Sequence, residues 1–354
     1  ELYPVLLKRA YAAIKEVDPT AKVLGCSTAG IDTAFVQRCL DAEAPFDILT
    51  IHPYRGHLDD QGFIDELKAV ARLVDKRPVW ITEMGWPTQI GSLSELQQAH
   101  LLARCYLGAA AAGDSANVSW YDFREDGTDP FYNEHSFGAL RYDLQPKAAY
   151  IALHTLCNTL GPVSGAEPIE APDGVLAYRF EAPGRAPVLA VWSGEGGGTL
   201  LLEDAPPTLT VRSLVGRDTL LTTRGGKGLV TLRPSDPIYL LGAARTTLAG
   251  WPFAATTDTT GAQPGESIPL RLMLQGFAGQ AFDARVDAQL PEGWEVTEVA
   301  IPVPATGKAA GEVSVHLPET AAPGPHVLEF TVVTPLGRAT AQVRVEVLHD
   351  LLVQ

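Results

Sequence analysis

The sequence has few cysteines, few charged residues for its length and no long apolar run, and each shortage excludes a class of protein. Its four cysteines, Cys26, Cys39, Cys105 and Cys157, form no C-x-x-C pair, so a zinc site is not expected. All four lie in the first 160 residues, which predicts small buried side chains rather than a disulfide framework. No apolar run approaches the roughly 20 residues that cross a bilayer, so no membrane span is expected.

The charge balance excludes a further class. The chain has 42 acidic and 27 basic residues, and its net charge of −15 argues against nucleic acid as a partner. Hydrophobic residues make up 46% of the 354 residues, which predicts two or three packed domains. The first residues lead directly into a helical pattern, and no signal peptide is expected there.

Residues 1–160 alternate helical and extended patterns. Helices are expected at 1–17, 33–40, 62–74, 93–112 and 145–160, and strands at 22–25, 47–51, 79–82 and 118–122. Ser94 and Gln97 are spaced as a capping box, and Pro146 suits the first turn of the last helix. The alternation predicts an α/β fold with a parallel sheet, and no glycine fingerprint for a dinucleotide follows the first strand.

Only four strands are expected where an eight-stranded barrel has eight. A full (β/α)8 barrel needs roughly 250 residues. The sequence therefore predicts that residues 1–160 are strands 5–8 of a TIM barrel, the second half of the catalytic domain of an N-terminally truncated chain. The outer edge of the first strand would then need to be covered or paired.

From residue 161 the pattern changes to a period of two with frequent turns. Residues 161–246 are predicted to form a β-sandwich, followed by a linker over 243–250, and residues 251–352 a second, immunoglobulin-like sandwich. The expected strands are 175–180, 188–192, 199–202, 209–215, 228–232, 238–241, 267–274, 282–290, 312–316, 326–333 and 339–347.

The strand that ends in Glu83 carries the strongest chemical signal. Val79–Ile81 predicts a buried strand, and Gly85 and Pro87 open a loop directly after it. Reactive groups of parallel barrels sit at the C-terminal ends of the strands. Trp86 lies beside this strand end, and aromatic faces suit sugar rings. We predict that Glu83 is a glycosidase nucleophile; the alternative is a carboxylate that caps a backbone or pairs with an arginine.

The neighbouring strand ends supply further candidates for substrate binding. Tyr54 would donate a hydrogen bond to the nucleophile and His52 would contact a sugar hydroxyl, unless both only close the mouth of the barrel. Trp120 would stack on a sugar or pack in the core. Arg124 and Glu134, in the loop after the last strand, are substrate-contact candidates, although most of that loop reads as a solvated surface.

Four runs at these strand ends carry a resemblance: I-H-P-Y-R-G, V-W-I-T-E-M-G-W-P-T, S-W-Y-D-F and E-H-S-F-G-A-L-R-Y-D-L-Q-P-K-A-A-Y. Together they resemble the second half of a clan A glycoside hydrolase, family 39-like or family 5-like. The resemblance implies a TIM barrel, a retaining mechanism on a polysaccharide or oligosaccharide, and no metal or cofactor. It implies Glu83 as the nucleophile, with Tyr54 and Trp120 in contact with the substrate.

The resemblance also bears on the acid/base residue. In the clan this glutamate follows an asparagine at the end of the fourth strand, which would lie before Glu1. The pair Asn133-Glu134 falls in the last loop instead, so the acid/base is unassigned and the chain alone is expected to have little activity. The two sandwiches resemble modules appended to secreted bacterial glycosidases, which implies a secreted or cell-surface location.

Two other functions fit the same residues. In a non-catalytic carbohydrate-binding or cell-surface protein, the barrel would be degenerate and the sandwiches would bind the sugar. A barrel that transfers sugars instead of hydrolysing them would share the whole site. The sequence does not identify the sugar, the linkage, or whether the enzyme is exo- or endo-acting.

Overall fold

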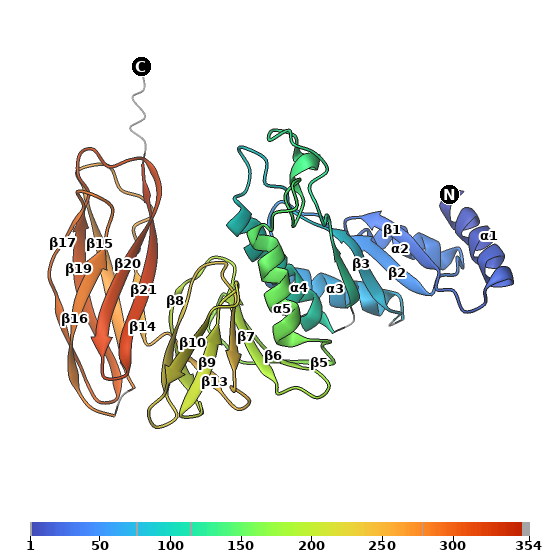
Figure 1. Cartoon of the computed structure of the whole chain (residues 1–354). Helices are drawn as coiled ribbons and strands as arrows, with labels where there is room; N and C mark the ends of the chain where they lie inside the picture. Colours follow the sequence, from blue (N-terminus) through green and yellow to red (C-terminus); the bar gives the residue numbers. More distant parts are fainter. Residues whose placement is uncertain (1, 76, 114, 278, 349–354) are drawn as a thin grey trace, which may run out of the picture.

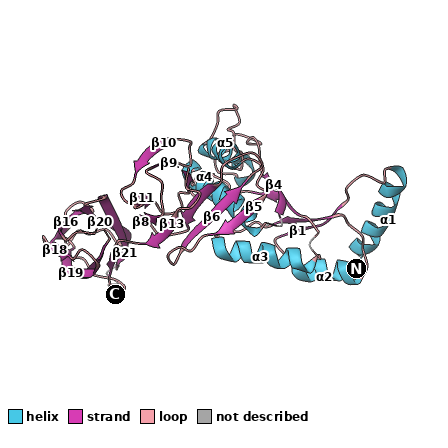
Figure 2. Ribbon diagram, turned by 90° about the horizontal axis from the view of Figure 1, so that it is seen from below, coloured by secondary structure: helices cyan, strands magenta, loops and turns pink. Residues whose placement is uncertain are grey.

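The computed structural model describes residues 2–75, 77–113, 115–277 and 279–348. Three regions follow one another along the molecule, with the N-terminal helix at one end and the last β-sheets at the other (Figures 1 and 2). We call them the N-terminal part (2–160), the middle part (161–250) and the C-terminal part (251–348).

The N-terminal part is a parallel sheet with helices between its strands. The sheet order is β1-β2-β3-β4, the order of the strands along the chain. The strands are β1 Leu24–Ala29, β2 Ile48–His52, β3 Val79–Met84 and β4 Ser115–Trp120. The helices are α1 Leu2–Val17, α2 Thr33–Asp41, α3 Asp60–Leu73, α4 Glu95–Ala112 and α5 Ala148–Leu160, with a short 3-10 helix, η1, at Asn133–Ser136.

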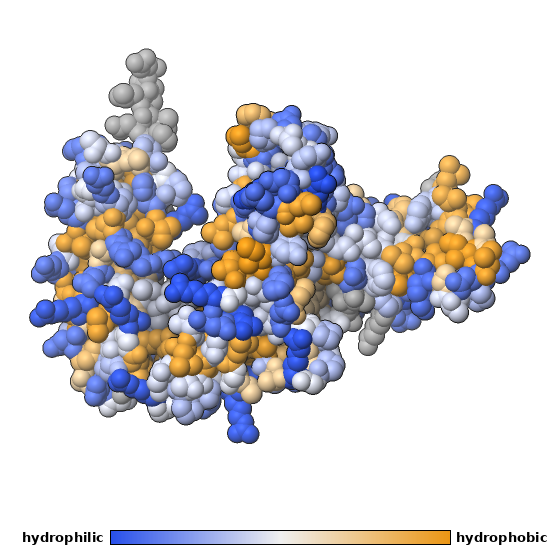
Figure 3. Space-filling model, viewed as in Figure 1, coloured by the Kyte–Doolittle hydropathy of each residue, from blue (hydrophilic) through white to orange (hydrophobic). Residues whose placement is uncertain are grey.

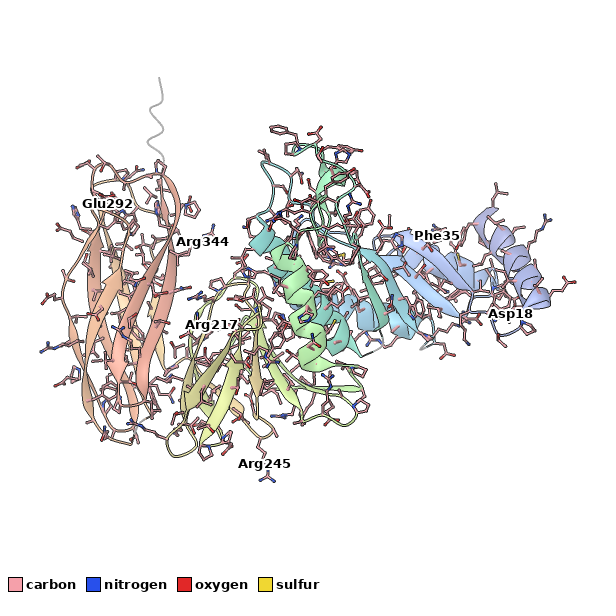
Figure 4. All side chains as sticks on the ribbon, viewed as in Figure 1. Asp18, Phe35, Arg217, Arg245, Glu292 and Arg344 are labelled. Carbon is pink, nitrogen blue, oxygen red and sulfur yellow. The ribbon has the colours of Figure 1, made fainter. Side chains whose placement is uncertain are left out.

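Local sequence signals explain most of these boundaries. The predicted capping box is confirmed, because Ser94 accepts from the Gln97 amide while Gln97 Oε1 accepts from the Ser94 amide. Asp18 follows the last residue of α1 and lies at one end of the molecule (Figure 4). The ring of Phe35 in α2, also labelled in Figure 4, packs 5.2 Å from the ring of Tyr3 in α1.

Three predictions for this part were wrong. β1 begins two residues and ends four residues later than expected, and β4 begins three residues and ends two residues earlier, so Asp122 lies beyond the end of β4. Pro146 precedes α5, because Leu140 bridges to it in a turn before the helix and Lys147 is the N-cap. All four cysteines are free, and three are buried as expected, but Cys157 is exposed.

The middle part is built from antiparallel strands in two layers. One sheet has the order β10-β9-β12-β7-β6-β5, and β8 pairs with β11 and with β13 in the other. The strands are β5 Gly165–Pro168, β6 Val175–Glu181, β7 Val188–Ser193, β8 Gly198–Glu203, β9 Thr208–Arg212, β10 Asp218–Thr222, β11 Gly228–Leu232, β12 Ile238–Leu241 and β13 Thr247–Gly250. The predicted linker over 243–250 therefore contains a strand, β13, that pairs with β8.

The C-terminal part is also antiparallel and shares a sheet with the middle part. Its strands are β14 Phe253–Thr256, β15 Ser267–Gly276, β16 Phe282–Gln289, β17 Glu295–Val296, β18 Ala300–Val303, β19 Gly307–His316, β20 Gly324–Thr334 and β21 Gly337–Val347. One sheet is β14-β15-β19-β17, and the other continues from β18, β16, β20 and β21 to β8 through the pair Ala341–Gly198. Thr199 Oγ1 also accepts from the Thr340 amide at 2.8 Å.

Strand β7 explains how the middle part is held against the N-terminal part. Every residue of β7 is buried, because the sheet has apolar neighbours on both faces. Val191 faces the core inside the middle part, whereas Trp192 joins the core that contains α3 and α4. The sheet of the middle part is therefore packed on the helices of the N-terminal part.

A buried ionic cluster lies at this contact. The Arg104 guanidinium of α4 donates to both Asp60 oxygens, at 3.0 and 2.5 Å, and to Leu58 O at 2.9 Å. Trp192 Nε1 donates to Asp60 Oδ1 at 3.0 Å, and the Arg104 and Asp60 side chains are only 5% and 6% exposed. Arg104 also donates to Ser235 Oγ at 3.3 Å, so the cluster joins the two parts.

Replacing Arg104 by methionine should destabilise the protein strongly, since it leaves the Asp60 carboxylate buried without its cation. Removing one partner of a buried pair costs about 3–5 kcal/mol in free energy of unfolding. The matched control is Arg338→Met, which breaks the exposed Arg338–Asp287 pair and should change stability by less than about 1 kcal/mol. Denaturant unfolding followed by tryptophan fluorescence checks both, and equal effects of the two substitutions would contradict the prediction.

Candidate active site

Parallel pairing brings the ends of β2 and β3 to the same edge of the sheet. Ile51 of β2 pairs with Ile81 of β3, so His52 and Thr82 come next in register. His52 Nε2 lies 2.9 Å from Thr82 Oγ1, which fixes the imidazole beside the strand end. His52, Tyr54 and Glu83 therefore meet at one place, as the sequence predicted.

A β-bulge in β3 determines where Glu83 stands. Ile81 pairs with Val118 and Met84 pairs with Trp120, so β3 has one more residue than β4 across this interval. The extra residue breaks the strict alternation of sides between Ile81 and Met84. Ile81 and Met84 are fully buried, whereas the Glu83 side chain is 37% exposed. The bulge thus turns the Glu83 carboxylate toward solvent, although Ile81 and Met84 of the same strand are buried.

Two groups contact the Glu83 carboxylate. Tyr54 Oη donates to Oε1 at 2.7 Å, and His52 Nδ1 lies 3.5 Å from Oε2. Burial, together with the Glu83 carboxylate, raises the pKa of the Tyr54 phenol, so it remains a protonated donor across the physiological range. A carboxylate with one fixed donor and an open face is oriented for attack on a bound electrophile. Among the described residues, the Glu83 side chain makes no ion pair with an arginine and caps no backbone amide, the two alternatives that the sequence left open.

The loop after β3 is packed closely against the end of β4. A Cβ on Gly85 would lie 1.9 Å from Tyr121 O, so only glycine fits there. Trp86 is 3% exposed and donates from Nε1 to Arg55 O at 2.7 Å, and its ring lies 6.0 Å from that of Trp120. The ring of Trp86 therefore offers little surface to a sugar, and it packs against the half-buried Trp120.

Residues 121–147, which we call the site loop, join β4 to α5 and project from the sheet edge at the top of Figure 1. Phe137 packs against both Tyr54, at 6.2 Å between ring centroids, and Tyr121, at 5.2 Å. Glu134 accepts from Asn133 at 2.8 Å and from Tyr121 Oη at 3.4 Å. Glu134 is thus linked to the site through aromatic contacts, and within the described part of the chain it makes no hydrogen bond to Glu83.

Arg124 stands apart from this group. Its Nε donates to Tyr142 O at 2.8 Å, and the guanidinium lies 4.4 Å above the centre of the Tyr142 ring. The structure places it on the exposed side of the site loop, where it holds two segments of that loop together. Its predicted contact with substrate therefore remains a prediction.

Sequence reasoning missed the residue that anchors the site loop. The Lys147 side chain is fully buried, and its Nζ donates to Thr88 Oγ1 at 2.8 Å, Glu125 Oε1 at 3.0 Å and Ser136 O at 3.2 Å. One ammonium thus joins the loop after β3 to two segments of the site loop. A lysine directly before a helix, with a glutamate upstream, is too common a pattern to have signalled this.

Asp122 is a second residue that the sequence did not single out. Its Oδ1 is buried without a hydrogen-bond partner. Burial, together with the charge of Asp126, raises the pKa of Asp122 to about 6. Among the described residues, no group of three or more His, Cys, Asp or Glu side chains is placed to hold a metal ion, and no described helix is long and apolar enough to cross a membrane.

Comparisons with known proteins find similarity to glycoside hydrolases. Residues 21–135 match the family described as glycosyl hydrolase catalytic core. The chain is similar to a family 39 glycoside hydrolase of Bacteroides cellulosilyticus WH2, with 27% identity and a TM-score of 0.61, over 68% of this chain and 54% of that one. It is also similar to a family 39 β-xylosidase of Caulobacter crescentus, with 16% identity and a TM-score of 0.42, over 67% and 61% of the two chains.

The second similarity is too distant to support an inference. The chain spans only about half the length of the Bacteroides protein, and less than two thirds of the Caulobacter protein. No curated protein sequence matches the chain. The predicted mixed α/β fold is confirmed by the first similarity, whereas the eight-stranded barrel and the identity of the two β-rich parts stay predictions.

Replacing Asp122 by asparagine should change how stability depends on pH. An unfolded aspartate has a pKa of about 3.9. Between about pH 4 and 6 the Asp122 carboxyl is therefore ionised in the unfolded protein but neutral in the folded protein, and above about pH 6 it must ionise while buried. The wild type therefore loses stability from this group as the pH rises to about 7, and Asp122→Asn does not. Melting temperatures at pH 4.5 and 7.5 check this: the variant should gain relative to wild type at the higher pH.

The control for this prediction is Asp173→Asn, which removes an exposed carboxylate on the middle part. Its melting temperature relative to wild type should be nearly the same at both pH values. A difference between wild type and Asp122→Asn that does not depend on pH would show that this carboxyl titrates normally.

Proposed function

This chain is a relative of the clan A glycoside hydrolases, as its strand-end motifs predicted, and on that basis we propose that it is the second half of a retaining glycosidase whose nucleophile is Glu83. The observation that carries the proposal is the partly exposed Glu83 carboxylate held by Tyr54 Oη at 2.7 Å. A retaining enzyme needs a carboxylate that attacks the sugar and a second carboxyl group about 5 Å away as acid/base.

The proposed reaction has two steps. A Glu83 oxygen forms a bond to the anomeric carbon while the bond to the leaving oxygen breaks, and the acid/base carboxyl gives its proton to that oxygen. Water then attacks the anomeric carbon, returns a proton to the acid/base and releases Glu83 as a carboxylate. Tyr54 orients Glu83 in the free enzyme through its hydrogen bond, and His52 is placed to bind a sugar hydroxyl beside it.

The acid/base would come from another segment of the same barrel. In the described part of the chain, the sheet of the N-terminal part ends at β1 on one side and β4 on the other. Helix α1 also leaves Leu2, Leu6 and Val17 at least 64% exposed. Open edges and an uncovered apolar helix suit a half barrel whose first four strand–helix units complete the sheet and bring the second carboxyl group.

The β-rich parts are proposed to be a sandwich and an immunoglobulin-like module of a secreted or cell-surface enzyme. Their antiparallel sheets and separate cores support the first statement. The location rests only on the resemblance to appended modules. The substrate is proposed to be a polysaccharide or oligosaccharide, and no step in the scheme uses a metal or cofactor.

Removing the Glu83 carboxylate from the enzyme that contains both barrel halves should abolish turnover. Glu83→Ala should lower kcat by at least about a thousandfold, because the covalent step has no nucleophile. Added azide should then restore part of the rate and give a glycosyl azide of inverted configuration, detectable by proton NMR. The control is Glu66→Gln, an exposed carboxylate that pairs with Arg55, which should keep wild-type activity.

A Glu83→Ala enzyme with full activity would refute the assignment of the nucleophile. An intact enzyme that releases product of inverted configuration would refute the retaining mechanism even if Glu83 proves essential. The two readouts separate the identity of the residue from the stereochemistry.

Tyr54→Phe in the same enzyme tests the donor on Glu83. The phenol donates a hydrogen bond to a charged acceptor, and such bonds contribute about 1.5–3 kcal/mol, so kcat/KM should fall by about ten- to a hundredfold. A Tyr54→Phe enzyme with wild-type kcat/KM would mean that Tyr54 does not act through Glu83.

A further inference from the structure

The site loop carries aromatic side chains that nothing in the proposed mechanism uses. Four of them have exposed fractions between 46% and 71%: Phe123, Phe131, Tyr132 and Tyr142. We call these four residues the aromatic crest. Figure 3 shows apolar residues on the projecting loop at the top of the view. Single exposed apolar residues are ordinary, but four large aromatics on one loop next to a candidate active site indicate a binding surface.

The loop that carries the crest is held in one conformation by the bonds around it. Ile90 N donates to Pro130 O at 2.8 Å, and Thr88 N donates to Ser136 O at 3.0 Å, so the loop after β3 braces it on one side. Within the loop, Phe131 N donates to Asp129 Oδ1 at 3.0 Å. Lys147 closes the base of the loop. Rings on a braced frame lose little conformational entropy when a ligand binds them.

The loop that carries the crest contacts the candidate active site. Tyr54, which holds Glu83, packs on Phe137, and Phe137 packs on Tyr121. Tyr121 Oη contacts Glu134 of η1, and Tyr132 of the crest is the N-cap of η1. At the other end of the loop, Phe123 follows β4 by three residues. A ligand that leaves the site over this side of the sheet edge meets the crest.

We propose that the aromatic crest binds a neutral polysaccharide chain beyond the sugar that reacts at Glu83. Aromatic faces stack on the C–H faces of sugar rings, which repeat along such a chain. The site loop has six carboxyl side chains against three cations, namely Arg124, Arg141 and Lys147, and Lys147 is buried, so an anionic polysaccharide would be repelled. The inference rests on the proposed function for one point only, that the polysaccharide runs from the sugar at Glu83 toward the crest. Binding of the polysaccharide to the crest needs no hydrolysis.

Affinity electrophoresis of this chain tests the proposal without requiring activity. The gels contain one soluble neutral polysaccharide each, either mixed-linkage β-glucan, arabinoxylan or galactomannan, and polygalacturonate serves as the anionic comparison. At least one neutral gel should retard the wild type. Phe131→Ala combined with Tyr132→Ala should weaken that retardation by about tenfold or more, since two stacking rings are lost.

Three matched variants make the result specific. Leu220→Ala removes an exposed apolar side chain of similar exposure, 69%, from β10 of the middle part and should bind like wild type. Phe131→Trp combined with Tyr132→Phe keeps both rings and should retain binding. Glu83→Gln should also bind normally, so loss of the nucleophile and loss of the crest are told apart. Melting temperatures establish that each variant is folded.

The proposal is overturned if no neutral gel retards the wild type, if the double alanine variant binds as well as wild type, or if polygalacturonate retards the chain more strongly. Gel filtration tests whether the crest instead binds a second copy of this chain. A wild-type dimer that the double alanine variant converts to monomer would reassign the crest to self-association and overturn polysaccharide binding.

Discussion

The arrangement of the candidate site depends on the parallel register of β2, β3 and β4. Hydrogen-bonded pairing fixes which residues leave the sheet at the same level, so His52, Glu83 and Trp120 all lie near the same edge of the sheet. The bulge in β3 then sets the direction of one carboxylate, and Gly85 allows the chain to turn against Tyr121. These backbone constraints come first, and the polar contacts of Tyr54 and His52 are built on them.

Much of this could be predicted because it follows from local patterns. Buried strands followed by polar residues, a capping box at Ser94 and the helix–strand alternation are all properties of short segments. The bulge could not be predicted, since a stretch such as Val79–Met84 reads as one continuous strand whether or not an extra residue is accommodated. Short strands were missed for a related reason: β5, β13 and β17 have two to four residues, and their pairing depends on partners elsewhere in the chain.

The packing of the N-terminal and middle parts is a further feature that a segment-by-segment reading did not show. Trp192 contributes its ring to the apolar core on the helices and its indole N–H to the Asp60 carboxylate. Arg104 and Lys147 are both buried cations with several acceptors. Arg104, in the middle of α4, lies at the contact between the parts, and Lys147, the N-cap of α5, lies beneath the site loop. Both hold segments that are far apart in sequence, which is why sequence patterns alone did not reveal them.

The joint between β8 and β21 makes the middle and C-terminal parts mechanically continuous. A linker of flexible residues would let the last part swing freely, but here a backbone pair, the Thr199–Thr340 bonds and the Arg224–Pro335 contact cross the joint. With the middle part packed on the helices through Trp192, contacts run from the N-terminal part to the last sheet. Bending the molecule at either junction would have to break these contacts, so they favour one direction of the last sheet relative to Glu83.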